Sequence, residues 1–134
     1  MPRAILLLGG RDPDPDETRR RDVELVAAWR PGVVGVAGWS EAGRDAYELA
    51  AAHTEVERLV LLGTPRGEDD VARVQAKTLL LYGTKDDRAG SKDARWWKAQ
   101  LDARIEMSAG SGHDELLTRL WPRVLSFLAP GSLR

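Results

Sequence analysis

Ser40, Asp86 and His113 are the residues of this chain whose types could together perform nucleophilic chemistry. A serine hydroxyl is unreactive at neutral pH unless a histidine removes its proton, and the histidine needs an acid that holds its tautomer. Each of the three residues follows an apolar run, in the chain order serine, acid, histidine, which is one order in which such groups occur. These residues indicate acyl transfer from an ester-like carbonyl.

The stretch around Ser40 reads G-W-S-E-A-G over residues 38–43. A turn that presents a nucleophilic serine needs small residues on both sides, because its backbone is strained and crowded. Gly38 and Ala42 satisfy this need, with Ala42 in place of the usual second glycine and Gly43 directly after it. The same residues are also consistent with a tight strand-to-helix connection in which the serine has no catalytic role.

A phosphate-binding loop is the other interpretation of this stretch. Gly38 and Gly43 have the spacing of the motif G-x-x-x-x-G-K-[ST], but Arg44 and Asp45 stand where the lysine and the hydroxyl residue belong. Residues 84–87, T-K-D-D, resemble the guanine-reading motif of small GTPases, although a match of four residues has little specificity. Nucleotide binding therefore ranks last among the candidate functions.

Apolar runs must position these residues as strands. Runs that are apolar on successive residues suit strands covered on both faces, as in parallel sheets. Helical spacing between the runs favours an α/β fold, with function at the carboxyl ends of the strands. We expect a single domain over residues 1–134, with about five strands in a mostly parallel sheet between layers of helices. The predicted strands are residues 4–8, 33–37, 59–62, 78–82 and 104–107, and the predicted helices are residues 17–29, 41–53, 91–101 and 114–128, with a shorter candidate at 67–76.

Composition excludes several classes of function. There is no cysteine, which excludes disulfides and thiolate chemistry, and His53 and His113 alone make a histidine-built metal site improbable. Lys and Arg total 20 against 21 Asp and Glu, so no charge excess points to nucleic acid or to an anionic membrane. The apolar run at residues 4–8 is too short for a membrane span or a signal peptide. We expect a cytoplasmic protein without cofactor or metal.

Residues 33–129 resemble α/β-hydrolase-fold serine esterases. The resemblance rests on GVAGWSEAGRDAYELAAAHTEVERLVLLGTP, on TLLLYGTKDD and on GSGHDELLTRLWPRVLSFLA, which occur in the family's order. It implies that Ser40 attacks the carbonyl, that His113 acts as base and then acid, and that Asp86 orients the imidazole. Asp87 competes for the acid role, but the spacing of Asp86 from Gly83 fits the family better.

The resemblance also implies an oxyanion hole made of two backbone donors. The N–H of Glu41, directly after the serine, should supply one donor, and Gly10 or Arg11, in the loop after the first strand, should supply the other. Family members usually have eight strands and a His-Gly stretch at the second donor, which this chain lacks. Either the first strand takes the place of a missing neighbour of the serine strand, or the gap is filled in some other way.

Only 15 residues separate Leu62 from Thr78, where many family members insert a cap, so we expect an open site with weak selectivity. Trp39 is either a wall of that site that contacts substrate or a packing residue under the turn. If every crossover stepped the same way, helices would gather on one face of the sheet, and a homodimer would cover the other. The sequence thus predicts a capless carboxylesterase or thioesterase, or else a catalytically weak, hydrolase-like binding or dimerisation module.

Overall fold

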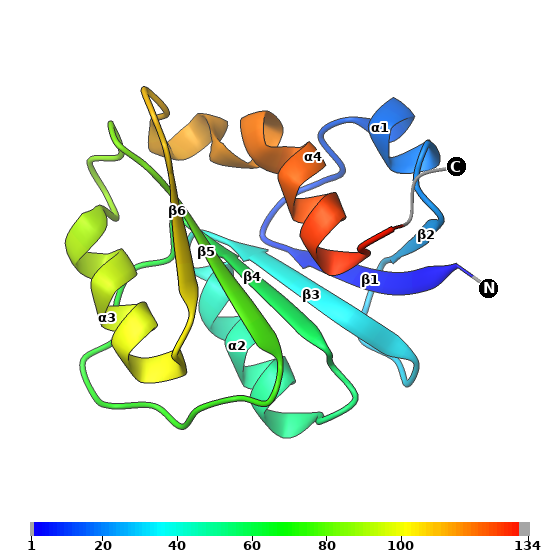
Figure 1. Ribbon diagram of the computed structural model, residues 1–134, viewed down its shortest axis with the longest axis horizontal. Coiled ribbons are helices and arrows are strands. Elements are labelled where there is room, and N and C mark those ends of the chain that lie inside the picture. The colour runs from blue at the N-terminus through cyan, green and yellow to red at the C-terminus, as the bar shows by residue number, and fades with distance from the viewer. Residues whose placement is uncertain (1, 132–134) are drawn as a thin grey trace.

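Strands and helices alternate along the chain in the computed structural model, which describes residues 2–131 (Figure 1). The strands are β1 (Arg3–Leu8), β2 (Val23–Val26), β3 (Val33–Trp39), β4 (Arg58–Leu62), β5 (Lys77–Gly83) and β6 (Arg104–Ser108). The helices are α1 (Pro15–Arg19), α2 (Ala42–Ala52), α3 (Ser91–Leu101) and α4 (Leu116–Leu128), and a 3₁₀ turn, η1 (His113–Glu115), leads into α4.

The six strands form one parallel sheet in the order β2-β1-β3-β4-β5-β6. β1 pairs directly with β3, which confirms that the first strand is the neighbour of the serine strand. The carboxyl ends of β1, β3, β4 and β5 therefore share one edge of the sheet, because parallel strands all end on the same side.

Two hydrophobic cores lie on opposite faces of the sheet, since side chains alternate along a strand. Leu59 and Leu61 of β4 point to one face, where they meet the buried Trp97 of α3 and residues of α2. Val60 and Leu62 point to the other face, against α4 and its fully buried Trp121. Successive residues of these strands are apolar because both faces of the sheet are covered, as the sequence predicted.

The predicted helix over residues 17–29 is wrong. The segment forms the short helix α1, whose N-cap Asp14 accepts a hydrogen bond from the N–H of Glu17, and then the edge strand β2 beside β1. Val23 and Val26 have helical spacing, but β-branched residues also suit strands, and pairing with β1 decides between the two. Within residues 2–131 the sheet therefore has six strands. The candidate helix at 67–76 is likewise irregular chain.

Helices cover both faces of the sheet, with α2 and α3 on one and α4 and α1 on the other (Figure 1). The indole Nε1 of Trp121 donates to Thr18 Oγ1 at 2.8 Å, which fastens α1 to α4. The expected crowding of helices on one face is wrong, because the chain steps from β1 outward to β2 before it returns to β3. The reason given for a homodimer no longer holds, and the dimer itself stays a prediction.

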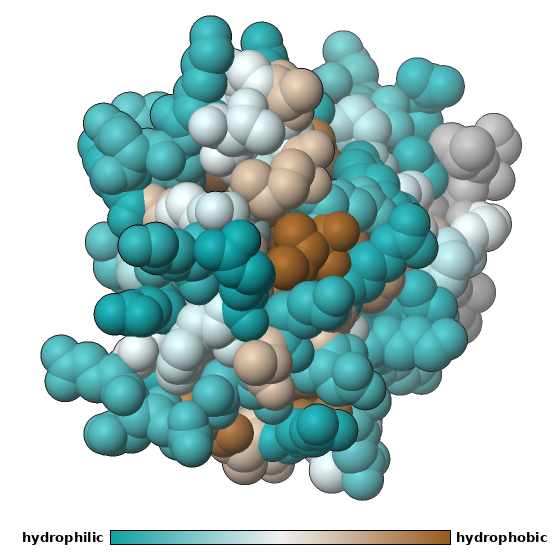
Figure 2. All heavy atoms as spheres, turned by 60° about the vertical axis from the view of Figure 1, so that its left-hand side comes forward, coloured by the Kyte–Doolittle hydropathy of each residue, from teal (hydrophilic) through white to brown (hydrophobic). Residues whose placement is uncertain are grey.

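The face that carries α3 and β6 is largely hydrophilic, with small apolar patches (Figure 2). Within residues 2–131, Met107 of β6 is the one large hydrophobic side chain that is exposed. None of the helices in this range is long and apolar enough to span a membrane.

Candidate active site

Ser40 lies in the turn between β3 and α2 with a left-handed backbone, at a φ of 58°. The turn is crowded. A Cβ on Gly38 would lie 2.6 Å from Gly43 Cα, and a Cβ on Gly43 would lie 1.9 Å from Thr64 Oγ1. The N–H of Ser40 donates to Leu62 O at 2.8 Å, which ties the turn to the end of β4. Both glycines are therefore required by close approach of neighbouring atoms.

This geometry argues against the phosphate-loop interpretation. A loop that cradles a phosphate must wrap it with backbone N–H groups, and here the two glycines at its ends are nearly in contact. The T-K-D-D stretch has a different role, because Asp86 within it contacts His113. The turn has the shape of a nucleophile elbow.

Ser40, His113 and Asp86 form an unbroken chain of hydrogen bonds. His113 Nε2 lies 2.8 Å from Ser40 Oγ, and His113 Nδ1 lies 2.7 Å from Asp86 Oδ2. The side chains of His113 and Asp86 are 2% and 0% exposed, and Ser40 is also buried. The arrangement can move a proton from the hydroxyl to an imidazole whose other nitrogen is held by a carboxylate.

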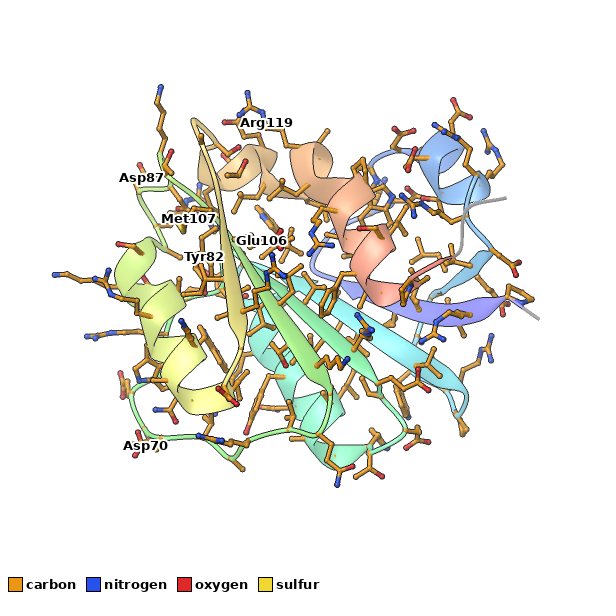
Figure 3. The ribbon with its side chains drawn as sticks, in the orientation of Figure 1. Asp70, Tyr82, Asp87, Glu106, Met107 and Arg119 are labelled. Carbon is orange, nitrogen blue, oxygen red and sulfur yellow. The ribbon has the colours of Figure 1, made fainter. Side chains whose placement is uncertain are left out.

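Asp86 itself is held by the backbone that follows it. Its Oδ1 accepts hydrogen bonds from the N–H groups of Arg88 at 2.8 Å and of Ala89 at 3.0 Å. Asp87, the competitor for the acid role, is exposed at the outside of the same loop (Figure 3). The structure therefore brings Asp86, and not Asp87, to His113.

The loops after β5 and β6 are joined to each other, which fixes the approach of His113. The N–H of Lys85 donates to Ser111 O at 3.0 Å, and the N–H of Gly110 donates to Thr84 Oγ1 at 2.8 Å. His113 is the first residue of η1, so the turn that opens α4 carries the imidazole. His53, the other histidine, is the C-cap of α2 and stacks on Trp29 with 4.1 Å between ring centroids.

The contacts of Trp39 bear on the two interpretations that the sequence left open, a substrate contact and a packing residue under the turn. Its Nε1 donates to His113 O at 3.2 Å, its ring lies 5.2 Å from the imidazole, and it packs against the core under α4. These contacts support the packing interpretation. A contact between Trp39 and substrate stays a prediction.

The loop after β1 lies beside the elbow, as the expected oxyanion hole requires. Gly9 has a φ of 87°, and a Cβ there would lie 2.7 Å from Trp39 O. Gly10 and Arg11 follow it in the same loop. The choice between these two as second donor stays a prediction, as does the N–H of Glu41 as the first.

The side chain of Glu41 is a feature that the sequence interpretation missed. Its Oε2 lies 2.7 Å from Ser40 Oγ, which also lies 2.8 Å from His113 Nε2, so the two acceptors compete for the single hydroxyl proton. From the sequence, only the backbone N–H of Glu41 had been considered. The hydrogen bond from Ser40, followed by one from the N–H of Glu41 itself, lowers the pKa of this exposed carboxyl. The available signal was an acidic residue directly after the candidate nucleophile.

Glu41 also lines a cavity of about 180 Å³ beside the elbow, together with Arg44, Thr64, Pro65, Arg66 and Gly67. The loop that follows β4 therefore forms one side of it. Within residues 2–131, no cluster of three or more His, Cys, Asp or Glu side chains is arranged to hold a metal ion.

Solved structures place this arrangement in a known fold. No protein-family model and no curated protein matches the sequence. An α/β hydrolase enzyme from a sediment metagenome of the Mar Chica lagoon, Morocco, is similar with a TM-score of 0.71 and 13% identity, over 96% of this chain and 89% of that one. The chain therefore has the α/β-hydrolase fold.

Two further structures agree with this assignment. A serine hydrolase without a lid from Xanthomonas campestris has a TM-score of 0.64 and 13% identity, over 98% of this chain and 84% of its own. The esterase domain of a Rhodothermus marinus protein has a TM-score of 0.64 and 10% identity, over 90% and 83%. The fold that the sequence resemblance implied is confirmed.

Proposed function

We propose that the chain is a serine hydrolase that cleaves carboxylic esters or thioesters through an acyl-enzyme on Ser40. The continuous hydrogen-bond chain from Asp86 through His113 to Ser40 Oγ carries the proposal. Its occurrence at the elbow of an α/β-hydrolase fold, a fold shared with esterases and with a serine hydrolase, supports the choice of reaction.

The first half of the reaction forms the acyl-enzyme. Ser40 Oγ attacks the carbonyl carbon while His113 Nε2 takes its proton, and Asp86 stabilises the imidazolium that results. The negative oxygen of the tetrahedral intermediate accepts hydrogen bonds from the N–H of Glu41 and from Gly10 or Arg11. His113 then gives its proton to the leaving alcohol or thiol, and the acyl group remains on Ser40.

The second half repeats these steps with water. His113 removes a proton from a water molecule, which attacks the acyl carbonyl, and the proton returns to Ser40 Oγ as the carboxylic acid departs. The cavity beside Glu41 gives room for part of the substrate without enclosing it. Short or extended acyl groups are thus the expected substrates.

The test combines a fluorophosphonate probe with an activated short-chain ester. We expect labelling and turnover with the wild type and neither with Ser40→Ala or His113→Ala. Ser91→Ala and His53→Ala are matched controls, because both residues lie outside the hydrogen-bond chain and should leave labelling intact. Labelling that survives Ser40→Ala would refute the assignment of the nucleophile.

One observation favours the alternative of a catalytically weak binding module. The Glu41 carboxylate lies against the nucleophile, with 2.7 Å between its Oε2 and Ser40 Oγ. If that carboxylate stays in place, its negative charge disfavours the tetrahedral intermediate. A correctly folded wild type that reacts with neither probe nor ester would support this alternative.

A further inference from the structure

We infer that Glu41 is a selectivity residue that favours acyl groups carrying a cation two carbons from the scissile carbonyl, and disfavours those carrying an anion there. The inference rests on the proposed hydrolase function and names its substrate class. It is carried by the contact of 2.7 Å between Glu41 Oε2 and Ser40 Oγ.

Geometry brings the substrate close to this carboxylate. In a productive complex the carbonyl carbon lies about 3–3.5 Å from the attacking oxygen, which here is also in contact with Glu41. A charged group two carbons beyond the carbonyl can then reach ion-pairing distance of the same carboxylate. An ammonium at that position is attracted, and a carboxylate is repelled.

The reaction strengthens this discrimination. The carboxylate of Glu41 lies 2.7 Å from Ser40 Oγ, so it repels the negative charge that develops on the oxyanion, and we expect the side chain to turn away as the intermediate forms. The side chain is exposed and borders the cavity of about 180 Å³, which gives it somewhere to turn. A substrate cation would pair with the carboxylate and offset its repulsion of the new oxyanion.

Two arginines on the cavity wall favour the opposite selectivity. Arg44 is already paired with Glu48, with 3.3 Å between Nε and Oε1. The backbone N–H of Arg66 binds the carboxylate of Asp93 at 2.9 Å, which places a second negative group beside that residue. Of the charged residues that line this cavity, Glu41 is the one whose side chain has a hydrogen bond with the nucleophile, so we expect its charge to dominate.

Three ethyl esters that differ only at the end of the acyl chain test the inference at pH 7. Ethyl 3-aminopropanoate ends in an ammonium, ethyl butanoate in a methyl and monoethyl succinate in a carboxylate. The measured quantity is the ratio of kcat/KM for the ammonium ester to that for the carboxylate ester. Comparing this ratio between variants cancels the intrinsic reactivities of the esters.

We expect Glu41→Gln to lower this ratio about tenfold relative to wild type, since an exposed charge contributes about threefold for attraction and about threefold for repulsion. Glu41→Lys should lower it further and favour the succinate ester. Asp45→Asn makes the same chemical change in an exposed carboxylate further along α2 and should leave the ratio unchanged.

A ratio that is equal in wild type and Glu41→Gln overturns the inference, as does a wild-type preference for the succinate ester, which would show that the arginines dominate. An equal loss for all three esters also overturns it, because Glu41 would then only support the elbow. Ser40-dependent hydrolysis of ethyl butanoate establishes the proposed hydrolase function independently of the selectivity. If wild type neither hydrolyses ethyl butanoate nor is labelled by the fluorophosphonate, both the hydrolase function and the selectivity role of Glu41 are refuted.

Discussion

The carboxylate of Asp86 binds the imidazole of His113 through one oxygen and its own loop through the other. Oδ2 lies 2.7 Å from His113 Nδ1, while Oδ1 accepts the N–H groups of Arg88 and Ala89. The position of the acid is thus set by backbone groups directly after it, which do not depend on the packing of other side chains.

Replacement of Asp86 by asparagine tests this relationship. An amide can present N–H to His113 Nδ1, which would favour the wrong tautomer and leave Nε2 unable to accept the proton of Ser40. We expect kcat to fall roughly 10³- to 10⁴-fold with little change in fold. Asp87→Asn is the control, because Asp87 is exposed on the same loop. Steady-state kinetics and circular dichroism measure both effects, and a loss of activity in Asp87→Asn alone would reverse the assignment.

Gly43→Ala should damage the elbow, because the added Cβ would lie 1.9 Å from Thr64 Oγ1. We expect a decrease of about 2–3 kcal/mol in the free energy of unfolding, in the range of overpacked sites. Thr64→Ala should recover part of this loss in the double variant, since it removes the colliding hydroxyl. Urea denaturation of the four proteins in this cycle measures the coupling, and strictly additive effects would contradict the proposed clash.

Tyr82, labelled in Figure 3, ties the end of β5 to the loop after β4, because its hydroxyl donates to Thr64 O at 2.5 Å. Tyr82→Phe leaves that carbonyl without its donor and should lower the free energy of unfolding by about 1 kcal/mol at pH 7. Activity per folded molecule should be retained, because the tyrosine does not contact Ser40 or His113.

The same variant has a distinctive pH dependence. Burial, with smaller effects from Asp93 and Asp86, raises the pKa of Tyr82 above its usual range. A raised folded-state pKa means that the contribution of Tyr82 is complete below the unfolded pKa of about 10 and is lost as the pH rises above it. The stability difference between wild type and Tyr82→Phe should shrink between pH 9 and pH 11. A constant difference over this range would contradict the buried hydroxyl.

Glu106 of β6 and Arg123 of α4 form a two-pronged ion pair, with Nε to Oε1 at 2.8 Å and Nη2 to Oε2 at 2.7 Å. Glu106 is labelled on β6 in Figure 3. Because both side chains are partly exposed, at 27% and 36%, we expect Arg123→Met to lower the free energy of unfolding by about 1 kcal/mol or less at pH 7.

The pH dependence of this pair has the opposite sign to that of Tyr82. The hydrogen bonds from Arg123 lower the pKa of Glu106, so the pair stabilises the fold above the ordinary carboxyl range and this contribution is lost as the pH falls. The difference between wild type and Arg123→Met should decrease as the pH falls below about 4.3 and vanish only below the lowered pKa of Glu106 in the folded protein. Arg104→Met is the control, since Arg104 is 73% exposed and contacts Glu106 only at 3.3 Å. An equal effect of the two variants would mean that the paired geometry contributes nothing.

The sequence predicted five strands correctly, and four of them, β1, β3, β4 and β5, are mostly apolar runs covered on both faces, whereas the edge strand β6 alternates Arg104, Ile105, Glu106 and Met107. It failed at β2, where Val23, Leu25 and Val26 are consistent with both helix and strand. No local property separates the two at that length, and pairing with β1 settles the matter. The helix predicted over residues 17–29 would have left the sheet one strand short.

In the candidate site, too, the sequence predicted the residue types, and the tertiary structure determined their geometry. Ser40, Asp86 and His113 were found from residue type and order, because an activated serine needs a base and an acid in separate strand-end loops. Their distances depend on neighbouring strands that end at one edge of the sheet, which only the folded chain provides. The sequence likewise did not determine that β1 pairs with β3, nor that the loop of Gly10 and Arg11 lies beside the serine turn.

By itself the sequence determined the fold class, the elbow and the chemical types at its strand ends, because apolar runs, glycines and reactive side chains are local properties. The tertiary structure decided which carboxylates reach the reacting groups. Asp86 meets His113 while Asp87 faces outward, and Glu41 contacts Ser40. Contacts of this kind depend on the direction of each side chain in space, which is fixed only when residues distant in the chain are packed together.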